Sequence, residues 1–413
     1  MVDSSLSKID ESTSIVMPRL SISVNEYKGR AKRLREEMAK RGLDAFLVTN
    51  GVSIFYMSGF YHMVTERPAA LLVPMDGDLT FMGPLLEADH LKHQTQLVKR
   101  VHTYLDYPGT THPIDLFAKW LTDLGYAKSK IGTDNPSGAS ATMGYTGPSL
   151  TEKLPEAKLV KADDILWEMR LTKSPEELAL IRESAKWGNL AHQLLQEYTG
   201  PGRWDADVAL EATTEATAIM KKTLGPEYAP IAGTRCCSAG YRGQVGWKSA
   251  MPHSIAIDRP IELGDVLVTG AGADVGGYNS ELERTMIVGP PTDRQKHYFE
   301  VMVKAQDAAI ASLKPDATCA DVDKAANKVI NDAGLKELVR HHTGHGIGLQ
   351  GHEPPWLDQG NPALLKPGMV VSIEPGIYRL GYAGFRHSDT LIVTEDGNEI
   401  VTYYPRDIES LTI

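Results

Sequence analysis

Four short segments in the second half of the chain carry polar side chains that a purely structural strand or turn does not need. Together they supply three carboxylates and three histidines, enough for acid–base chemistry or for holding a metal ion. The segments are MPHS (251–254), GYNSELERT (277–285), HHTGHGIGLQGHEPP (341–355) and SIEPGIY (372–378), and the side chains are His253, Glu281, Glu283, His345, His352 and Glu374.

Two of the glutamates lie two positions apart in a predicted strand, so Glu281 and Glu283 project from one face. Like charges this close raise the pKa of at least one carboxyl group unless a cation, a metal ion or a ligand lies between them. A solvated strand face is the structural alternative, although the apolar run MIV follows at 286–288. Glu374 stands among apolar neighbours, where a carboxylate is costly unless it is paired, hydrogen-bonded or bound to a metal.

The histidines differ in how strongly they indicate a site. In segment 341–355 glycines alternate with histidines, so the backbone can bend closely around a ligand while His345 and His352 offer imidazoles on separate turns. A histidine-rich surface loop is the alternative explanation. His253 by itself is weak evidence, because a single histidine ahead of a strand is more often a surface or hydrogen-bonded residue.

The elements around these segments predict two domains that differ in secondary structure. A chain of 413 residues is also longer than one hydrophobic core usually supports. Residues 1–20 are expected to form a flexible tail. Residues 21–165 predict an α/β domain, with an amphipathic helix ending near Gly42, a buried strand, and a hairpin turning at Asp76 and Gly77.

Residues 166–413 predict an α+β domain of antiparallel strands covered by helices. Its first long helix starts where Ser174 is a good N-cap, Pro175 fits the first helical position and Glu177 completes a capping box. Further helices are predicted at 205–223, 294–313 and 319–334, with glycine-rich strand pairs between them.

Composition limits the partners and the compartment. A net charge of −10 with a sequence pI of about 5.7 provides no basic field for nucleic acid. The first twenty residues lack the basic and apolar regions of a secretory signal, and no later stretch is long enough to span a membrane. The odd count of three cysteines does not suggest a disulfide framework, so a cytoplasmic location is expected.

The order of four motifs resembles the creatinase/prolidase/methionine-aminopeptidase superfamily over nearly the whole chain. The motifs are RLTKSPEEL (170–178), GYNSELERT (277–285), TGHGIGLQGHEPP (343–355) and IEPGIY (373–378). The resemblance implies a smaller creatinase-like N-terminal domain, a C-terminal catalytic domain of the pita-bread fold, and a homodimer.

The same resemblance bears on the metal content of the site. In metallopeptidase members, an Asp, a second Asp, a His, a Glu and a final Glu hold two ions. The matching positions here are Gly270, Glu281, His345, Glu374 and Ser388. Glycine offers no side-chain ligand and a neutral hydroxyl binds divalent metals poorly, so a dinuclear centre is not expected. Glu281, His345 and Glu374 are enough to hold one Zn, Mn or Co ion.

Other positions resemble the creatinase branch, which works without metal. Glu283 matches the glutamate that holds the substrate guanidinium, His253 matches a proton shuttle, and Arg67 matches an N-domain arginine that grips the substrate carboxylate in the partner subunit's site. His352 instead matches a substrate-contacting histidine of the peptidases. Thr65 replaces a ring-flanking phenylalanine of creatinase, so creatine is not the expected substrate.

Three functional hypotheses follow from these residues. The first is metal-independent hydrolysis of a C–N bond in a small zwitterion. In it His253, Glu283 and Glu374 are catalytic, and Arg67, Glu281, His345 and His352 bind the substrate. The second is a mononuclear metal-dependent dipeptidase for Xaa-Pro dipeptides, and the third is a non-catalytic pseudopeptidase that binds peptides or proteins.

Overall fold

The computed structural model describes residues 20–139, 145–225, 228, 231, 236–256 and 258–413. The chain divides into two compact units, Met1–Met169 and Arg170–Ile413. The sequence predicts this division near residue 165, and the predicted tail at 1–20 lies outside the described residues apart from Leu20.

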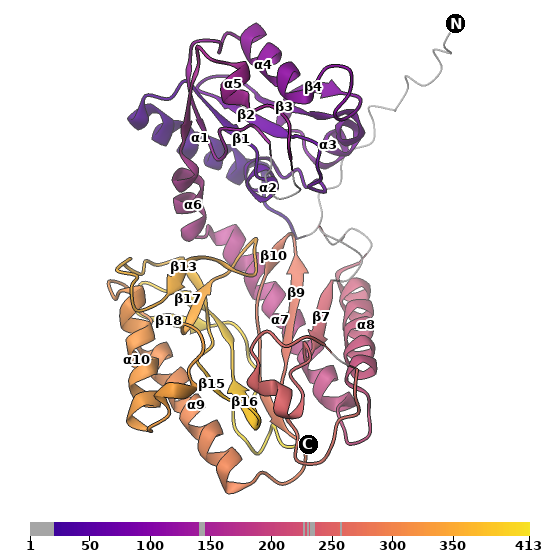
Figure 1. Ribbon diagram of the computed structural model, residues 1–413, viewed down its shortest axis with the longest axis vertical. Helices are drawn as coiled ribbons and strands as arrows, with labels where there is room; N and C mark the ends of the chain where they lie inside the picture. The colour runs from indigo at the N-terminus through magenta and orange to yellow at the C-terminus, as the bar shows by residue number, and fades with distance from the viewer. Residues whose placement is uncertain (1–19, 140–144, 226–227, 229–230, 232–235, 257) are drawn as a thin grey trace, which may run out of the picture. The chain divides into compact units, whose positions relative to one another are not determined.

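The N-terminal unit is built on a mixed sheet with strand order β4-β3-β2-β1-β5-β6 (Figure 1). Strand β1 pairs antiparallel with β2 and parallel with β5, and β2 and β3 form the hairpin predicted at Asp76 and Gly77. Its elements are α1 Val24–Arg41, β1 Ala45–Val48, α2 Gly51–Ser58, β2 Ala70–Pro74, β3 Leu79–Pro84, η2 Leu85–Glu87, α3 Ala88–Gln94, β4 Val98–Tyr104, α4 Pro113–Asp123, β5 Lys130–Thr133, α5 Leu150–Lys153, β6 Lys158–Lys161 and α6 Asp163–Leu171, which runs across the division.

Local signals explain where the first helix of this unit begins and ends. The Ser23 side chain accepts a hydrogen bond from the Glu26 N–H, which satisfies one of the free donors of the first turn of α1. Gly42 ends the helix at φ 61°, a left-handed conformation that costs glycine little. The sheet core then packs Leu47 and Leu72 against Phe117 of α4.

The C-terminal unit consists of antiparallel pairs with helices packed outside, as the sequence predicts. The strands order as β13-β12-β14-β17-β18, β10-β9-β7, β11-β8 and β15-β16. Its elements are α7 Pro175–Tyr198, α8 Asp205–Leu224, β7 Cys237–Gly240, η4 Gly246–Ala250, β8 Val266–Val268, β9 Gly270–Val275, β10 Tyr278–Asn279, β11 Thr285–Ile287, α9 Asp293–Ser312, α10 Cys319–Asp332, η5 Lys336–Leu338, β12 Gly344–Gly346, β13 Glu353–Leu357, β14 Val370–Ile373, β15 Gly376–Arg379, β16 Ala383–Arg386, β17 Asp389–Val393 and β18 Asn398–Ile400.

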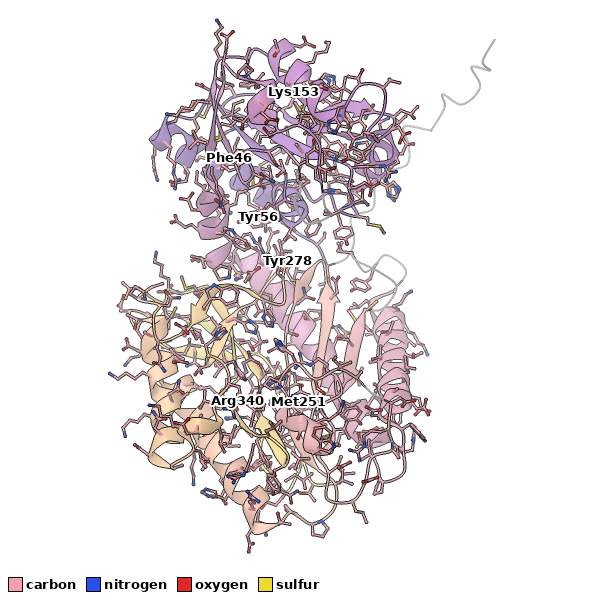
Figure 2. All side chains as sticks on the ribbon, in the orientation of Figure 1. Phe46, Tyr56, Lys153, Met251, Tyr278 and Arg340 are labelled. Atoms are coloured by element: carbon pink, nitrogen blue, oxygen red, sulfur yellow. The ribbon has the colours of Figure 1, made fainter. Side chains whose placement is uncertain are left out.

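Helices enclose the strands of this unit from two sides. Helices α7 and α8 pack on β7 and β9, whereas α9 and α10 pack together beside β13, β14 and β16 (Figure 1). Helix α7 starts with the predicted capping box between Ser174 and Glu177. The buried Tyr278 hydroxyl, labelled in Figure 2, donates to the Glu177 carboxylate at 2.8 Å and ties the helix to β10.

The predicted helices at 205–223, 294–313 and 319–334 correspond to α8, α9 and α10, with ends that agree within two residues. The strand predicted to carry Glu281 and Glu283 is interrupted. The two glutamates lie between β10 and β11, because Leu282 bridges to Ala271 while Glu283 bridges to Ser388. Within the described residues, no helix has both the length and the apolar character needed to cross a lipid bilayer.

Candidate active site

The predicted acidic side chains of the C-terminal unit converge on one cluster. One carboxylate oxygen from each of Glu281, Glu283 and Glu374 lies within 4.8 Å of the other two, although Glu281 and Glu283 are not in a continuous strand. Backbone bonds from the Glu283 N–H to the Ser388 carbonyl and from the Glu374 N–H to the Thr343 carbonyl hold the segments that carry them. Three acidic groups drawn from separated parts of the sequence thus meet at one point.

Glu283 is buried and bound by two arginines of its own chain. The Arg386 guanidinium donates to both carboxylate oxygens, with its Nη2 2.8 Å from Oε1, and Arg242 donates to Oε1 as well. The buried Arg386 also lies 3.6 Å from the Glu374 carboxylate. Burial opposes protonation of Arg386, but Glu283, Tyr378 and Glu374 outweigh it and keep the pKa of Arg386 well above its usual value, so this guanidinium is charged at neutral pH. The cation that the sequence required between these carboxylates is supplied by the protein.

Glu281 is held by hydroxyl groups rather than by a cation. The Ser372 and Ser388 hydroxyls each donate to its Oε1 at 2.7 Å, and the two serine oxygens are 2.6 Å apart. Ser388 therefore acts as a hydrogen-bond donor to a neighbouring carboxylate at the position matching the last metal ligand of the peptidases. The Oε2 atom of Glu281 accepts no hydrogen bond within the described part of the chain.

His345 is fully buried in β12, where glycines permit a close approach of the strands. A Cβ atom at Gly344 would lie 2.0 Å from the Ser372 carbonyl oxygen, and one at Gly346 would lie 2.2 Å from the Pro354 carbonyl oxygen. The His345 Nδ1 is 3.0 Å from the Gly346 carbonyl oxygen. Because a carbonyl oxygen only accepts, Nδ1 carries the proton, and Nε2 faces the acidic cluster.

The charge around His345 Nε2 is strongly negative. Nε2 is 3.4 Å from the nearest Glu374 oxygen and has no partner with hydrogen-bond geometry among the described residues. Burial opposes protonation, but Glu374 and Glu281 outweigh it and raise the pKa of His345 to about 9. Burial also opposes ionisation of Glu374, yet His345 and Arg386 hold its pKa below the usual value. The site thus favours a positive charge at Nε2.

The other predicted site residues are less enclosed. The exposed His352 ring stacks on His345, with ring centroids 3.9 Å apart, and belongs to one group of potential ligands with Glu281 and His345. His253 lies on the exposed loop after Met251, which is labelled in Figure 2, and makes no hydrogen bond or ring contact within the described residues. Arg67 belongs to the N-terminal unit, where it pairs with Glu66 at 2.6 Å.

Two arginines and a chain of polar groups at this site escaped the sequence reasoning. Arg386 stands two residues before Ser388, and Arg242 lies in the turn YRGQ, but neither position carries a signal that separates it from a surface arginine. Behind Arg386, the Tyr378 hydroxyl accepts from Nη1 at 3.0 Å and lies 2.8 Å from the His341 Nε2. Only the folded chain reveals these contacts.

Comparison with known proteins identifies the family to which this geometry belongs. The model of metallopeptidase family M24 matches residues 179–395, and the model of the creatinase/prolidase N-terminal domain matches residues 30–172. The chain belongs to metallopeptidase family M24. It has the two-domain, pita-bread architecture of that family and is a hydrolase acting on C–N bonds.

Similar M24 proteins include named dipeptidases. An Xaa-Pro dipeptidase of Pyrococcus horikoshii is 29% identical over 92% of this chain and 98% of its own length. A probable dipeptidase PepE of Mycobacterium tuberculosis is 31% identical over 90% of this chain and 92% of its own. The solved dipeptidase PepE of Mycobacterium ulcerans has a TM-score of 0.79 at 29% identity, covering 95% of this chain and all of that one. These likenesses favour the dipeptidase hypothesis over the creatinase-like one.

Proposed function

We propose that the chain is a metal-dependent dipeptidase for Xaa-Pro dipeptides that uses a single divalent ion held by Glu281, His345 and Glu374. The observation that carries the proposal is the state of His345. Its Nδ1 donates to a backbone carbonyl, which is the usual support of a metal-binding imidazole, while its buried Nε2 faces two carboxylates without a hydrogen-bond partner among the described residues.

The carboxylate ligands also support one metal ion per site. The serine hydroxyls fix Glu281 through Oε1 and leave Oε2 for an ion, as second-shell donors do in metal sites. Three carboxylates face two guanidinium groups, which leaves one negative charge uncompensated when His345 is neutral. One divalent ion suits this balance, whereas two ions would leave a large excess of positive charge in a buried cluster.

Among the described residues, the positions that match the ligands of a second ion in two-metal peptidases are not available to one. Gly270 has no side chain to offer, Ser388 donates to Glu281, and Glu283 is occupied by Arg386 and Arg242. The donor set therefore fits one divalent metal ion and does not fit the pair used by other metallopeptidases.

The protein groups then have distinct tasks in hydrolysis. A bound divalent ion would act as a Lewis acid toward the attacking water and the scissile carbonyl group. Glu374, whose side chain is 12% exposed, accepts a proton from that water. His352, exposed beside His345, contacts the dipeptide, and His253 returns a proton to the leaving prolyl nitrogen. Arg386 keeps Glu283 neutralised and limits the mobility of Glu374.

The metal-independent hypothesis has one specific observation in its favour, the loss of ligands at Gly270 and Ser388. It assigns Glu283 to a substrate cation, however, and that carboxylate already accepts from two buried or half-buried arginines. A substrate amidine or guanidine would have to displace one of them. The pseudopeptidase hypothesis does not explain why so many charged groups are buried, which costs free energy, when no reaction uses them.

Turnover and metal content decide among these hypotheses. The purified protein is chelated exhaustively, its metal content is measured by elemental analysis, and Ala-Pro hydrolysis is followed with Zn²⁺, Mn²⁺ or Co²⁺ added back. We expect about one ion per chain and activity only in the reloaded protein. Turnover of a zwitterion panel that survives chelation would establish the metal-independent hypothesis, and Ala-Pro binding without turnover would establish the pseudopeptidase.

Two histidine variants sharpen this experiment. His345→Ala removes the proposed ligand and should lose both the ion and the turnover. His297→Ala, on the exposed surface of α9, should retain both. Metal retained by His345→Ala at the stoichiometry of the parent protein would contradict the proposed ligand set.

Assembly and compartment belong to the same proposal. A homodimer in which Arg67 reaches the neighbouring site would bring a guanidinium to the carboxylate of the dipeptide, which an arginine binds through paired N–H donors. The three cysteines are free and buried, which is compatible with a reducing cytoplasm.

A further inference from the structure

Arg242 is presented to the acidic cluster by a tight turn with unusual backbone geometry. The Gln244 N–H donates to the Tyr241 carbonyl at 2.8 Å, and both central residues have positive φ, 50° at Arg242 and 73° at Gly243. Two-residue turns of this kind favour glycine, asparagine or aspartate at their centre, because the left-handed conformation is unfavourable for larger side chains. Among described residues other than glycine, only Arg242 and Asp316 have positive φ.

The surroundings of the turn hold it in place. The Tyr241 hydroxyl lies 2.5 Å from the Thr199 hydroxyl, and the Gln244 side-chain oxygen accepts from Arg386 at 3.3 Å. A Cβ atom at Gly243 would lie 2.6 Å from the Ile255 carbonyl oxygen, so the turn also packs against the loop that carries His253. An unfavourable conformation that is fixed from several sides is typical of a functional residue.

The guanidinium of Arg242 lies beside the position of the missing metal ligand. A Cβ atom at Gly270 would be 3.8 Å from the Arg242 Nε and 3.7 Å from the Glu283 Oε1. Gly270 matches the first aspartate of the two-metal peptidases. A cationic side chain therefore lies beside the position at which the two-metal peptidases have a carboxylate that holds an ion.

The Arg242 guanidinium has more N–H groups than its hydrogen bonds within the described residues use. It directs one N–H to Glu283, and its guanidinium makes no other hydrogen bond within the described part of the chain, although it carries five N–H groups. Its side chain is 53% exposed, whereas that of Arg386 is 4% exposed. Arg386 is thus enclosed by the protein, and Arg242 offers free donors to whatever enters the site.

From this geometry we propose that Arg242 supplies the positive charge that a second metal ion provides in related enzymes, by binding the negative oxygen formed on the scissile carbonyl. The inference rests on the proposed function. Water adds to the carbonyl carbon, the π electrons of the C=O bond move to oxygen, and Arg242 N–H groups bind that oxyanion. The C–N bond then breaks as the oxyanion reforms the carbonyl group, and the prolyl nitrogen takes up a proton.

Replacement of Arg242 separates this role from a structural one. Arg242→Asn removes the guanidinium and places a residue that tolerates the left-handed turn, so thermal stability should be maintained or raised. We expect kcat for Ala-Pro to fall by about 10²- to 10³-fold, the usual effect of losing an oxyanion donor, with KM changed less than about threefold. The metal content should remain that of the parent protein.

Chemical rescue provides a second readout. Millimolar guanidinium added to Arg242→Ala should restore part of the lost kcat, which a purely structural defect would not allow. The control is Arg182→Ala, because Arg182 is similarly exposed and forms a surface ion pair with Glu399 on the same unit. Its kcat should stay within about twofold of the parent and should not respond to guanidinium.

Binding of a tetrahedral anion tests the inference without turnover. Calorimetry with a phosphinic analogue of Ala-Pro should give at least about 30-fold weaker binding to Arg242→Asn than to the parent protein, since the analogue reproduces the charge of the oxyanion. Proline itself, which has no such group, should bind both equally.

The outcomes are distinguishable from those of the proposed function. Failure of the reloaded parent protein to cleave any Xaa-Pro dipeptide would refute the proposed function, and the calorimetric result would still decide whether Arg242 binds a tetrahedral anion. With an active parent protein, an unchanged kcat in Arg242→Asn would overturn the inference. So would an effect confined to KM, a loss of metal, or equal binding of the analogue.

Discussion

At the scale of single residues, the acidic cluster depends on an ion pair that water does not reach. Arg386 and Glu283 are both nearly fully buried, and the pair is stable only because each charge satisfies the other. Arg284, the residue after Glu283, forms a second buried pair with Asp389 of β17, at 2.8 Å. Such pairs contribute little net stability when intact but are costly to break, so they act mainly by fixing geometry.

Arg386→Met tests this dependence. The variant leaves Glu283 buried with only the half-exposed Arg242 as a partner, and we expect a loss of about 3–5 kcal/mol in the free energy of unfolding. Urea unfolding measures it. Adding Glu283→Leu to the same chain should recover a large part of the loss, and a double variant as unstable as the single one would show that the packing of Arg386, rather than its charge, stabilises this region.

At the scale of elements, β12 shows how sequence composition controls the approach of strands. His345 faces the cluster because Gly344 and Gly346 let β12 lie against β14 and the Pro354 region more closely than any side chain would permit. The glycines of the motif therefore serve strand packing as well as ligand access. The pairing of β12 with β13 also changes register between His345 and Gly346.

Gly344→Ala should displace β12. A methyl group 2.0 Å from a backbone oxygen forces the strands apart, and we expect a loss of at least about 1–3 kcal/mol in unfolding free energy together with weaker metal binding. Gly351→Ala is the matched control in the same motif, because a Cβ atom there meets nothing within 4 Å. Thermal unfolding and metal titration of both variants give the comparison, and equal behaviour would disprove the packing role of Gly344.

At the scale of the whole molecule, each unit buries a neutral histidine. Burial lowers the pKa of His62 to about 4 in the N-terminal unit, and burial followed by the charge of Arg284 lowers that of His192 to about 3 in the C-terminal unit. Unfolded histidine titrates near 6.5, so below that pH each of these two histidines binds more protons in the unfolded chain than in the folded one. Acid therefore destabilises both units.

The expected loss for His192 alone is about 2 kcal/mol in unfolding free energy between pH 7 and pH 5. Urea unfolding at the two pH values measures the total effect. His192→Gln, which can keep a hydrogen bond to Thr269, should reduce the difference by about that amount. An unaltered pH dependence in this variant would rule out the titration of His192 as its source.

The proposed reach of Arg67 into the active site of the partner subunit is also a property of the assembled molecule. Arg67→Ala and His345→Ala should each be inactive alone, because one lacks the carboxylate anchor and the other the metal ligand. A dimer formed from both contains one complete site, so unfolding and refolding an equal mixture should restore about a quarter of the parent activity. If mass spectrometry detects the heterodimers but no activity returns, Arg67 does not reach the partner's site.

The sequence alone was enough to predict the two domains, the capping box of α7 and the extents of α8 to α10, because local propensity and hydrophobic period depend on residues close together in the chain. The expectation that three glutamates meet His345 came instead from the resemblance to the creatinase/prolidase superfamily, since these residues are far apart in the chain. The interruption at Glu281 and Glu283 was not predicted, because it arises from pairing with two distant strands.

Tertiary structure decided the charge balance of the site. Arg386 neutralises Glu283, Ser388 donates to Glu281, and Arg242 occupies the space beside Gly270. None of these contacts follows from a residue's type or its neighbours in sequence, because a cation stabilises a buried carboxylate only at contact distance, and that distance is set by how the strands pack. The sequence therefore determined which groups were available, and the fold determined which of them still lack a partner.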